Sequence, residues 1–195
     1  MTTKVSAAEK EKARILTPEF RVSYPHVFKP NSIQGSKPKY SITMLFDKKQ
    51  DLKVIKEAMR VAKTIKFGPD QSKWPKNLEN PISDGDNVKY ADKEGYKGHW
   101  AIKASTNEDQ KPGVVDEKVQ PILDATQFYP GCYARAYVYA YVWEFAGKTG
   151  IGFILDHVQK TGEGKSFGGK KPVDQVFTAV NNNEVANEEV EQDFV

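Results

Sequence analysis

The chain has 195 residues, of which 38% are hydrophobic and 28% charged, a composition typical of a folded domain. Its single cysteine, Cys132, excludes an intramolecular disulfide framework and fits a reducing compartment. No segment approaches the roughly 18 apolar residues of a membrane span, and the N-terminal residues lack the apolar core of a secretory signal. We therefore expect neither a secreted protein nor a membrane protein.

The net charge of +3 conceals a division between the body of the chain and its C-terminal end. All 29 lysines and arginines lie at or before Lys171, together with 20 of the 26 acidic residues, so residues 1–171 carry a net charge of +9. The six remaining acids give residues 172–195 a charge of −6. A basic body favours the binding of a polyanion, and the C-terminal end has the opposite sign.

The chain begins with residues 1–12, which we expect to be flexible and solvated. Residues 15–24 are predicted to form a strand, which Pro18 either breaks or bends at an edge. Prolines and a glycine punctuate residues 25–38, which we expect to form a loop. A second strand is predicted at residues 40–46.

A helix is predicted after the second strand. Asp47 and Gln50 have the spacing of a capping box. Apolar residues then recur at intervals of three and four from Leu52 to Ile65, which predicts an amphipathic helix with one buried face. Gly68 and the proline after it are expected to end the helix.

The second half of the chain alternates long loops with strands. Residues 69–98 are predicted to be a polar loop, followed by a short strand at 99–104 and another loop at 105–131. Residues 132–145 are predicted to form a long strand, which turns through glycines into a partner strand at 151–160 as a hairpin.

These elements favour a mainly β fold with one helix and long loops. Short strands without a regular alternation of strands and helices indicate a small antiparallel barrel, with the helix closing one end. We place this domain at residues 13–171. Residues 172–195 have too little apolar surface to fold alone and are expected to be a disordered acidic tail.

The strand predicted at residues 132–145 has two different faces. Its even positions up to 142 are small and apolar, which suits a tightly covered core. Its odd positions are Tyr133, Arg135, Tyr137, Tyr139, Tyr141, Trp143 and Phe145. Such a row suits a surface that stacks flat rings, and every base of a nucleic acid has a face to stack. A row of aromatic residues also commonly belongs to a protein core, and both interpretations stay open.

Basic and aromatic residues are interleaved in other segments as well. Trp74, between Lys73 and Lys76, is the clearest example in a loop, where an aromatic residue has less reason to be buried. A basic surface that follows phosphates, combined with rings that stack bases, is typical of sequence-independent binding to single-stranded nucleic acid. The candidate contact residues are Lys39, Lys73, Trp74, Lys76, Lys97, Trp100, Lys103, Arg135, Tyr137, Tyr139, Tyr141, Lys165 and Phe167.

Motifs for catalysis or cofactor binding are incomplete. The segment 164–166 resembles the end of a phosphate-binding loop, but Gln159 stands where that motif requires glycine. Asp84, Asp86 and Asp92 form an acidic stretch without the spacing of a calcium-binding EF-hand loop. We expect no enzyme activity, no cofactor and no metal. A metal-dependent nuclease that uses the three aspartates is a weaker hypothesis.

The acidic tail permits two interpretations. It could serve only to keep the protein in solution. Alternatively, its carboxylates could mimic nucleic acid and occupy the basic surface when DNA is absent, while an aromatic residue near the end docks on partner proteins. The residues concerned are Glu184, Glu188, Glu189, Glu191, Asp193 and Phe194.

Four segments carry a family resemblance. They are the RVSYP motif at residues 21–25, the run FYPGCYARAYVYAY that begins at Phe128, the strand predicted at 150–155, and the acidic tail. Together they resemble phage single-stranded-DNA-binding proteins of the OB-fold type and, more distantly, the T7-type phage single-stranded-DNA-binding proteins.

This resemblance implies an OB-fold of about five strands that binds single-stranded DNA in phage replication and recombination, in the cytoplasm of a bacterial host. It also implies a tail that competes with DNA and recruits replication proteins. Weaker binding of duplex DNA or RNA, and self-association or cooperative binding along DNA, stay open. The alternative is a non-enzymatic phage structural or adaptor domain whose aromatic row is core.

Overall fold

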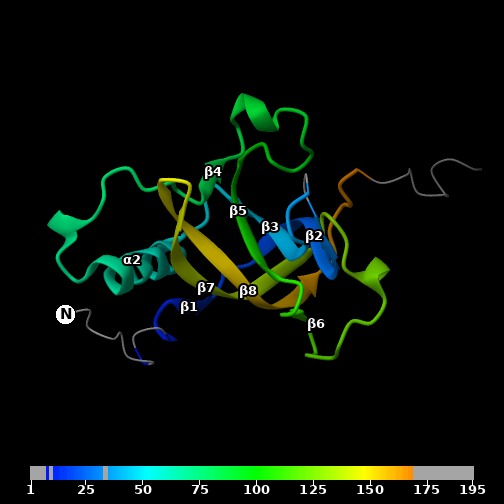
Figure 1. Cartoon of the computed structure of the whole chain (residues 1–195). Coiled ribbons are helices and arrows are strands. Elements are labelled where there is room, and N and C mark those ends of the chain that lie inside the picture. Colours follow the sequence, from blue (N-terminus) through cyan, green and yellow to red (C-terminus); the bar gives the residue numbers. More distant parts are fainter. Residues whose placement is uncertain (1–7, 9–10, 33–34, 169–195) are drawn as a thin grey trace, which may run out of the picture.

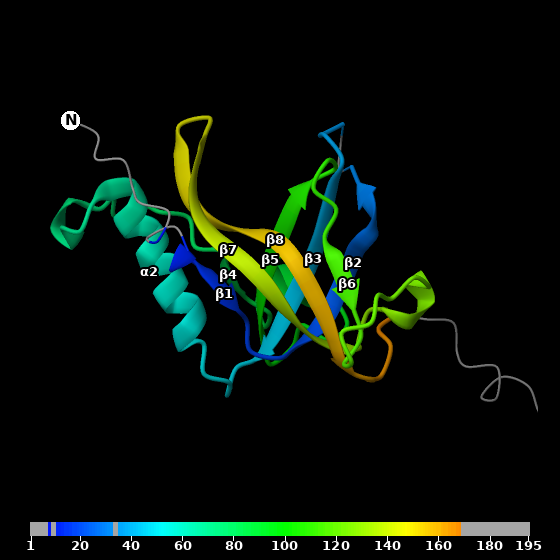
Figure 2. The same ribbon diagram turned by 90° about the horizontal axis from the view of Figure 1, so that it is seen from below.

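The computed structural model describes residue 8 and residues 11–32 and 35–168 (Figure 1). The strands are β1 (Arg14–Leu16), β2 (Phe20–Asn31), β3 (Lys39–Asp47), β4 (Ile82–Asp84), β5 (His99–Asn107), β6 (Gly113–Val115), β7 (Tyr133–Phe145) and β8 (Lys148–Gly162). The helix α2 spans Lys53–Phe67, and short 3-10 helices lie at Gln71–Lys73, Val88–Tyr90 and Ala125–Gln127. All of the strands join one strongly curved sheet, with α2 beside it (Figures 1 and 2).

Five strands of the sheet close into a barrel. They pair in the order β2–β3–β5–β8–β7, and β7 pairs again with β2. Only β5 and β8 run parallel within this ring. The seam between β7 and β2 is short, because it joins only Phe20 to Ala134 and Arg21 to Tyr133. A partly open five-stranded barrel is the architecture of an OB-fold, so the predicted fold class is confirmed.

The remaining strands extend the barrel at its edges. β1 pairs with β7, β4 with β5, and β6 with β8. β4 and β6 lie inside the segments that were predicted to be loops. Each has three residues, too few to show an alternating pattern.

Two prolines shape the beginning of the sheet. Pro18 lies between β1 and β2, so the predicted first strand is indeed split. The predicted loop at 25–38 is partly wrong, because β2 continues past Pro25 to Asn31. The register of β2 against β3 shifts between Ser23 and His26, and a bulge of this kind is where a strand tolerates proline.

The predicted helix is correct, but its predicted start is wrong. Asp47 ends β3 and accepts a hydrogen bond from Lys49 N at 2.8 Å, while the Gln50 side chain donates to Glu19 O. The capping box therefore does not form, and α2 begins at Lys53 without a side-chain cap. α2 lies beside β7 and β1 (Figure 2), and Ile55, Ala58 and Ala62 on its apolar stripe are buried. Among the described residues, no helix is long and apolar enough to cross a membrane.

The core of the barrel explains the small residues of β7. Cys132, Ala134, Ala136, Val138 and Ala140 are completely buried, and the large core side chains come from the other strands. Burial raises the pKa of the Cys132 thiol, as expected for a packing residue. The odd-numbered side chains of β7 point out of the barrel and are half-buried or exposed. The interpretation of the aromatic row as barrel core, on which the adaptor hypothesis depended, is therefore wrong.

Candidate nucleic-acid interface

A hollow of about 540 Å³ lies on the outer surface of β2, β3 and β5. Its floor consists of odd-numbered residues of β3 and β5. Ser41 lies opposite Ser105 and Thr43 lies opposite Lys103 in the paired strands. The even-numbered neighbours in both strands are buried in the barrel, so the pleat turns these polar side chains outward. We call this site the basic hollow.

Two further segments form the walls of the basic hollow. Tyr24 and His26 come from β2, where the bulge re-aims them. Tyr90, Lys93 and Tyr96, from residues 86–98 between β4 and β5, form the other part of the wall. We call this second segment the 86–98 loop.

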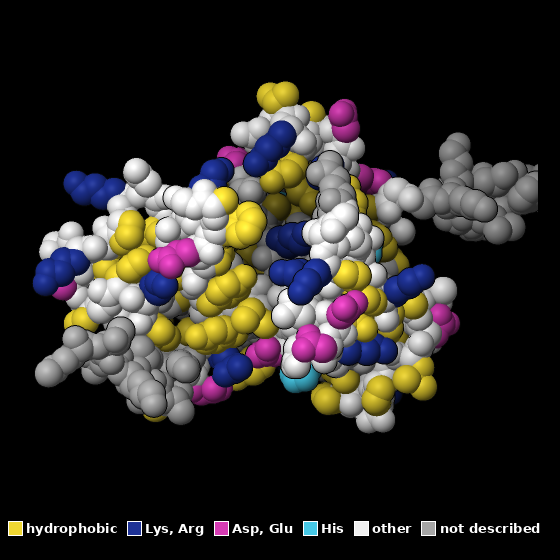
Figure 3. All heavy atoms as spheres, viewed as in Figure 1, with side chains coloured by type: hydrophobic (Ala, Val, Ile, Leu, Met, Phe, Trp, Pro, Cys, Tyr) yellow, Lys and Arg dark blue, Asp and Glu magenta, His cyan; other side chains and the backbone are white. Residues whose placement is uncertain are grey.

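The basic hollow is strongly positive. Lys37, Lys39, Lys93 and Lys103 line it, none of its described lining residues is acidic, and none of these lysines is in an ion pair within the described chain. In Figure 3, dark-blue basic side chains gather at the hollowed centre of the face shown. Burial, together with the charge of Lys103, lowers the pKa of His26, so its imidazole adds no further charge at neutral pH. Such a surface attracts anions.

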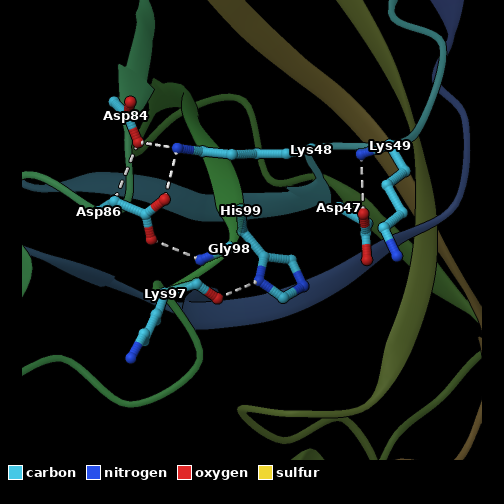
Figure 4. A network of polar contacts seen from close by, with 8 residues as sticks. All are labelled: Asp47, Lys48, Lys49, Asp84, Asp86, Lys97, Gly98 and His99. Carbon is cyan, nitrogen blue, oxygen red and sulfur yellow. Dashed lines mark hydrogen bonds and ion pairs between the residues drawn. The ribbon is translucent and has the colours of Figure 1, made fainter.

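A polar network holds the base of the 86–98 loop (Figure 4). Lys48 Nζ forms ion pairs with Asp84 and, at 2.6 Å, with Asp86. Asp86 Oδ1 also accepts a hydrogen bond from Gly98 N at 2.7 Å, and Lys48 N donates to Gly98 O at 3.0 Å. The two ends of the loop are therefore tied to each other and to the end of β3.

The same network bears on the hypothesis of a metal-dependent nuclease. Hydrogen bonds from Lys48 hold the pKa of Asp84 and of Asp86 below its usual range, so an ammonium group already compensates these two carboxylates. Within the part of the chain that the structure describes, no group of three or more acidic, histidine or cysteine residues is arranged to hold a metal ion.

The last described segment packs behind the 86–98 loop. The Phe167 ring lies against Gly95, where a β-carbon would collide with it, and the Arg21 guanidinium lies 4.3 Å from the ring centroid. Gly168 N donates to Glu94 at 2.7 Å. The described chain therefore ends beside a wall of the basic hollow.

The structure distributes the predicted contact residues over several surfaces. Lys39 and Lys103 line the basic hollow. Lys97 lies at the end of the 86–98 loop, and Lys165 and Phe167 belong to the segment behind it. Trp100 packs against the core, and the Lys48 ammonium lies over its ring. Lys73, Trp74 and Lys76 lie in the loop after α2. There the Trp74 indole donates to Gly68 O, and the Lys63 ammonium lies over its ring.

The aromatic row of β7 faces a different part of the outer surface. The Tyr141 ring packs over Gly152 of β8, and Tyr139 lies opposite Ile154. Ile154 is also paired with Ser105 in the floor of the basic hollow, so β8 connects the two surfaces. Figure 3 shows hydrophobic side chains gathered over β7 and β8 beside the basic centre.

Part of this row is occupied by contacts within the chain. The Tyr137 hydroxyl donates to Glu11 at 3.0 Å, and Arg14 lies 5.1 Å from the Tyr139 ring centroid. Arg135 Nε donates to the Gln159 side chain at 2.8 Å. Glu11 lies in the segment that was expected to be flexible. The tail residues Glu184, Glu188, Glu189, Glu191, Asp193 and Phe194 lie outside the described residues.

Of the residues that line the basic hollow, only Lys39 and Lys103 were among the predicted contact residues. Tyr24, Tyr90, Lys93 and Tyr96 were not among the predicted contact residues, although Tyr90 and Tyr96 each stand close to a lysine in the sequence. The alternation of polar and apolar residues along residues 39–44 and 102–105 could have indicated an outward polar face on both strands.

Comparison with known proteins identifies relatives of this architecture. A family model described as Enterobacter phage Enc34, ssDNA-binding protein, matches residues 13–195. The solved single-stranded DNA-binding protein from bacteriophage Enc34 in complex with ssDNA has a TM-score of 0.67 and 24% identity, over 85% of this chain and 97% of that one. Its C-terminal truncation gives a TM-score of 0.65 and 25% identity, over 86% and 98%.

A more distant structure shares the fold. Gp2.5, a single-stranded DNA-binding protein encoded by bacteriophage T7, has a TM-score of 0.56 and 15% identity, over 89% of this chain and 98% of that one. Comparison of the sequence with curated proteins gives no match.

Proposed function

The chain belongs to the Enterobacter phage Enc34 ssDNA-binding protein family, and we propose that it binds single-stranded DNA in the basic hollow, irrespective of sequence. The observation that carries this proposal is the concave surface of four lysines and three tyrosines over a hydroxyl-rich floor, without an acidic lining residue among those described. Lysines attract the phosphates of the strand, and tyrosine rings stack on any base. This combination gives binding without base-specific hydrogen bonds.

Salt dependence tests this assignment. Each phosphate neutralised on a single strand contributes about −0.7 to the slope of log K against log salt, so the four lysines of the basic hollow give a slope of roughly −2.8. The double variant Lys39→Ala/Lys103→Ala should reduce it to roughly −1.4, measured by fluorescence anisotropy with labelled oligo-dT.

A matched variant controls for loss of charge. Lys53→Ala/Lys56→Ala removes two lysines from the exposed side of α2, which packs against β7 and β1 rather than beside the basic hollow. This control should keep the wild-type slope. Equal effects of the two double variants would place the binding surface elsewhere. A duplex of the same length, included in the titration, shows how strongly the protein prefers single strands.

We further propose that the acidic tail competes with DNA for the basic hollow and recruits replication proteins. The position of Gly168 beside Glu94 supports competition, because residues 172–195 follow within a few residues of the hollow wall. Deleting residues 172–195 should tighten oligo-dT binding at low salt, and the difference should vanish at high salt because ions screen the attraction. Unchanged affinity at low salt would contradict competition.

A further inference from the structure

We propose that Tyr24, Tyr90 and Tyr96 form a subsite for one base of the bound strand, and that the Lys93 ammonium fills this subsite in the free protein. The inference rests on the proposed function and specifies how the basic hollow distinguishes a strand with accessible bases from a plain polyanion. We call the three residues the tyrosine cage.

The tyrosine cage surrounds a single ammonium group. Lys93 Nζ lies 5.3 Å from the Tyr24 ring centroid, 5.3 Å from that of Tyr90 and 5.6 Å from that of Tyr96. All three distances are within the reach of a cation–π interaction, about 6 Å. The rings of Tyr90 and Tyr96 lie 4.9 Å apart at an interplanar angle of 31°. Among the described residues, no carboxylate lies within ion-pair distance of Lys93, and its ammonium lies over the three rings.

The members of the cage differ in accessibility. Tyr96 is 3% exposed and forms the inner side, whereas Tyr24 is 50% exposed and offers a ring to solvent. Tyr24 has a φ of 46°, in the left-handed region that bulky residues rarely adopt, and it precedes a proline that disfavours helical backbone at this position. Such strain persists where surrounding structure enforces it, and it is concentrated at functional sites.

A nucleotide can exchange with the ammonium because it brings two groups at once. Its phosphate forms a charge-assisted hydrogen bond with Lys93, which is stronger than a neutral one. The rings that Lys93 leaves are then free to stack with the base. A polyanion without bases offers only the phosphate, and a duplex keeps its bases stacked inside the helix. The cage therefore favours strands with accessible bases over charge alone.

An abasic oligonucleotide separates the two contributions, because it has the phosphates of oligo-dT without the bases. Tyr24→Ala should weaken the binding of oligo-dT by about 5- to 150-fold, the effect of losing one stacked base, and leave the binding of the abasic strand unchanged. Tyr24→Phe keeps the ring and should retain wild-type affinity for oligo-dT. Because the Tyr24 side chain is half exposed, the variants are expected to fold, and thermal melting verifies this.

NMR tests the exchange of Lys93 directly. Ring currents in the cage should shift the side-chain ε-methylene protons of Lys93 upfield in the free protein, and oligo-dT should relieve the shift. A shift that persists in the complex overturns the exchange, and equal losses of oligo-dT and abasic binding in Tyr24→Ala overturn the base subsite. If wild-type protein binds neither strand, the proposed function itself fails.

Discussion

The base of the 86–98 loop offers a sharp test of how the fold positions the basic hollow. Gly85 N donates to His99 O at 2.9 Å, where the two ends of the loop meet. A β-carbon at Gly85 would collide with Tyr96 O, and it would lie 2.6 Å from His99 O and 2.9 Å from the carbonyl carbon of Tyr96. These are backbone atoms, which cannot rotate away as a side chain can. Gly85→Ala must therefore push the two ends of the loop apart.

The size of the displacement follows from these distances. Non-bonded heavy atoms rest at about 3.5 Å or more, so the backbone at Tyr96 and His99 has to move by roughly 1 Å or more. Overpacking of this kind costs about 1–3 kcal/mol in the free energy of unfolding, which a domain with a stability of about 5–15 kcal/mol survives. The shift carries Tyr90, Lys93 and Tyr96 away from the floor of the basic hollow. If one stacked base is lost, affinity for oligo-dT falls by about 5- to 150-fold.

Two measurements and a control examine this prediction. Urea denaturation gives the loss of stability, and anisotropy with labelled oligo-dT gives the loss of affinity. Gly147→Ala serves as the control, because Gly147 has a φ of 76° in the β7–β8 turn and no neighbouring atom within 4 Å of a β-carbon. It should lose stability through backbone strain and keep its affinity. Wild-type affinity in Gly85→Ala, despite lower stability, would refute a role of this loop in DNA binding.

Three other perturbations have defined outcomes. Burial and the neighbouring Lys103 depress the pKa of His26, whereas a bound phosphate would raise it. Protonation of His26 is therefore coupled to binding, and oligo-dT affinity should increase as the pH falls from about 7 to 5.5. The variant His26→Gln should abolish this trend. Lys48→Met leaves Asp84 and Asp86 facing each other without an ammonium group, so affinity measured by anisotropy should fall, while Lys48→Arg should restore it. Phe46→Ala removes a completely buried ring and should lower the free energy of unfolding by about 3–5 kcal/mol in urea denaturation, with no change in the salt slope of DNA binding.

The alternation along residues 132–145 predicted a strand with two different faces, but it left open which face points outward. The strand could be predicted because the two-residue period is a local property of the extended backbone. Small residues on the even side fit a barrel whose volume is filled by Phe20, Phe46 and Ile102 from other strands. The apolar stripe of α2 was predicted for the same reason, but the residue at which α2 begins was not. The Gln50 side chain forms a tertiary contact with Glu19 O, which a local capping rule does not include.

The basic hollow was harder to predict because it is assembled from distant segments. Tyr24 meets Lys93 only because β2 and the 86–98 loop flank the same face of the barrel. The bulge after Ser23, which aims Tyr24 at this face, depends on pairing with β3 and has no clear local pattern beyond the proline. Trp74 was predicted from its lysine neighbours, and its contact with DNA stays a prediction. In the structure its indole donates to Gly68 O, and the ammonium of Lys63 in α2 lies over its ring.

Electrostatics decides which of the two outer surfaces a strand would meet first. On the aromatic row, Arg14 pairs with Asp156 at 3.0 Å and with Glu11 at 3.3 Å, so its charge is compensated beside Tyr137 and Tyr139. The basic hollow has four lysines and no acid among its described lining residues. We therefore expect phosphates to be attracted to the hollow first. We propose that the aromatic row, which lies on the other side of β8, adds stacking once the strand is held there, so that the row extends the site and the four lysines of the hollow anchor it.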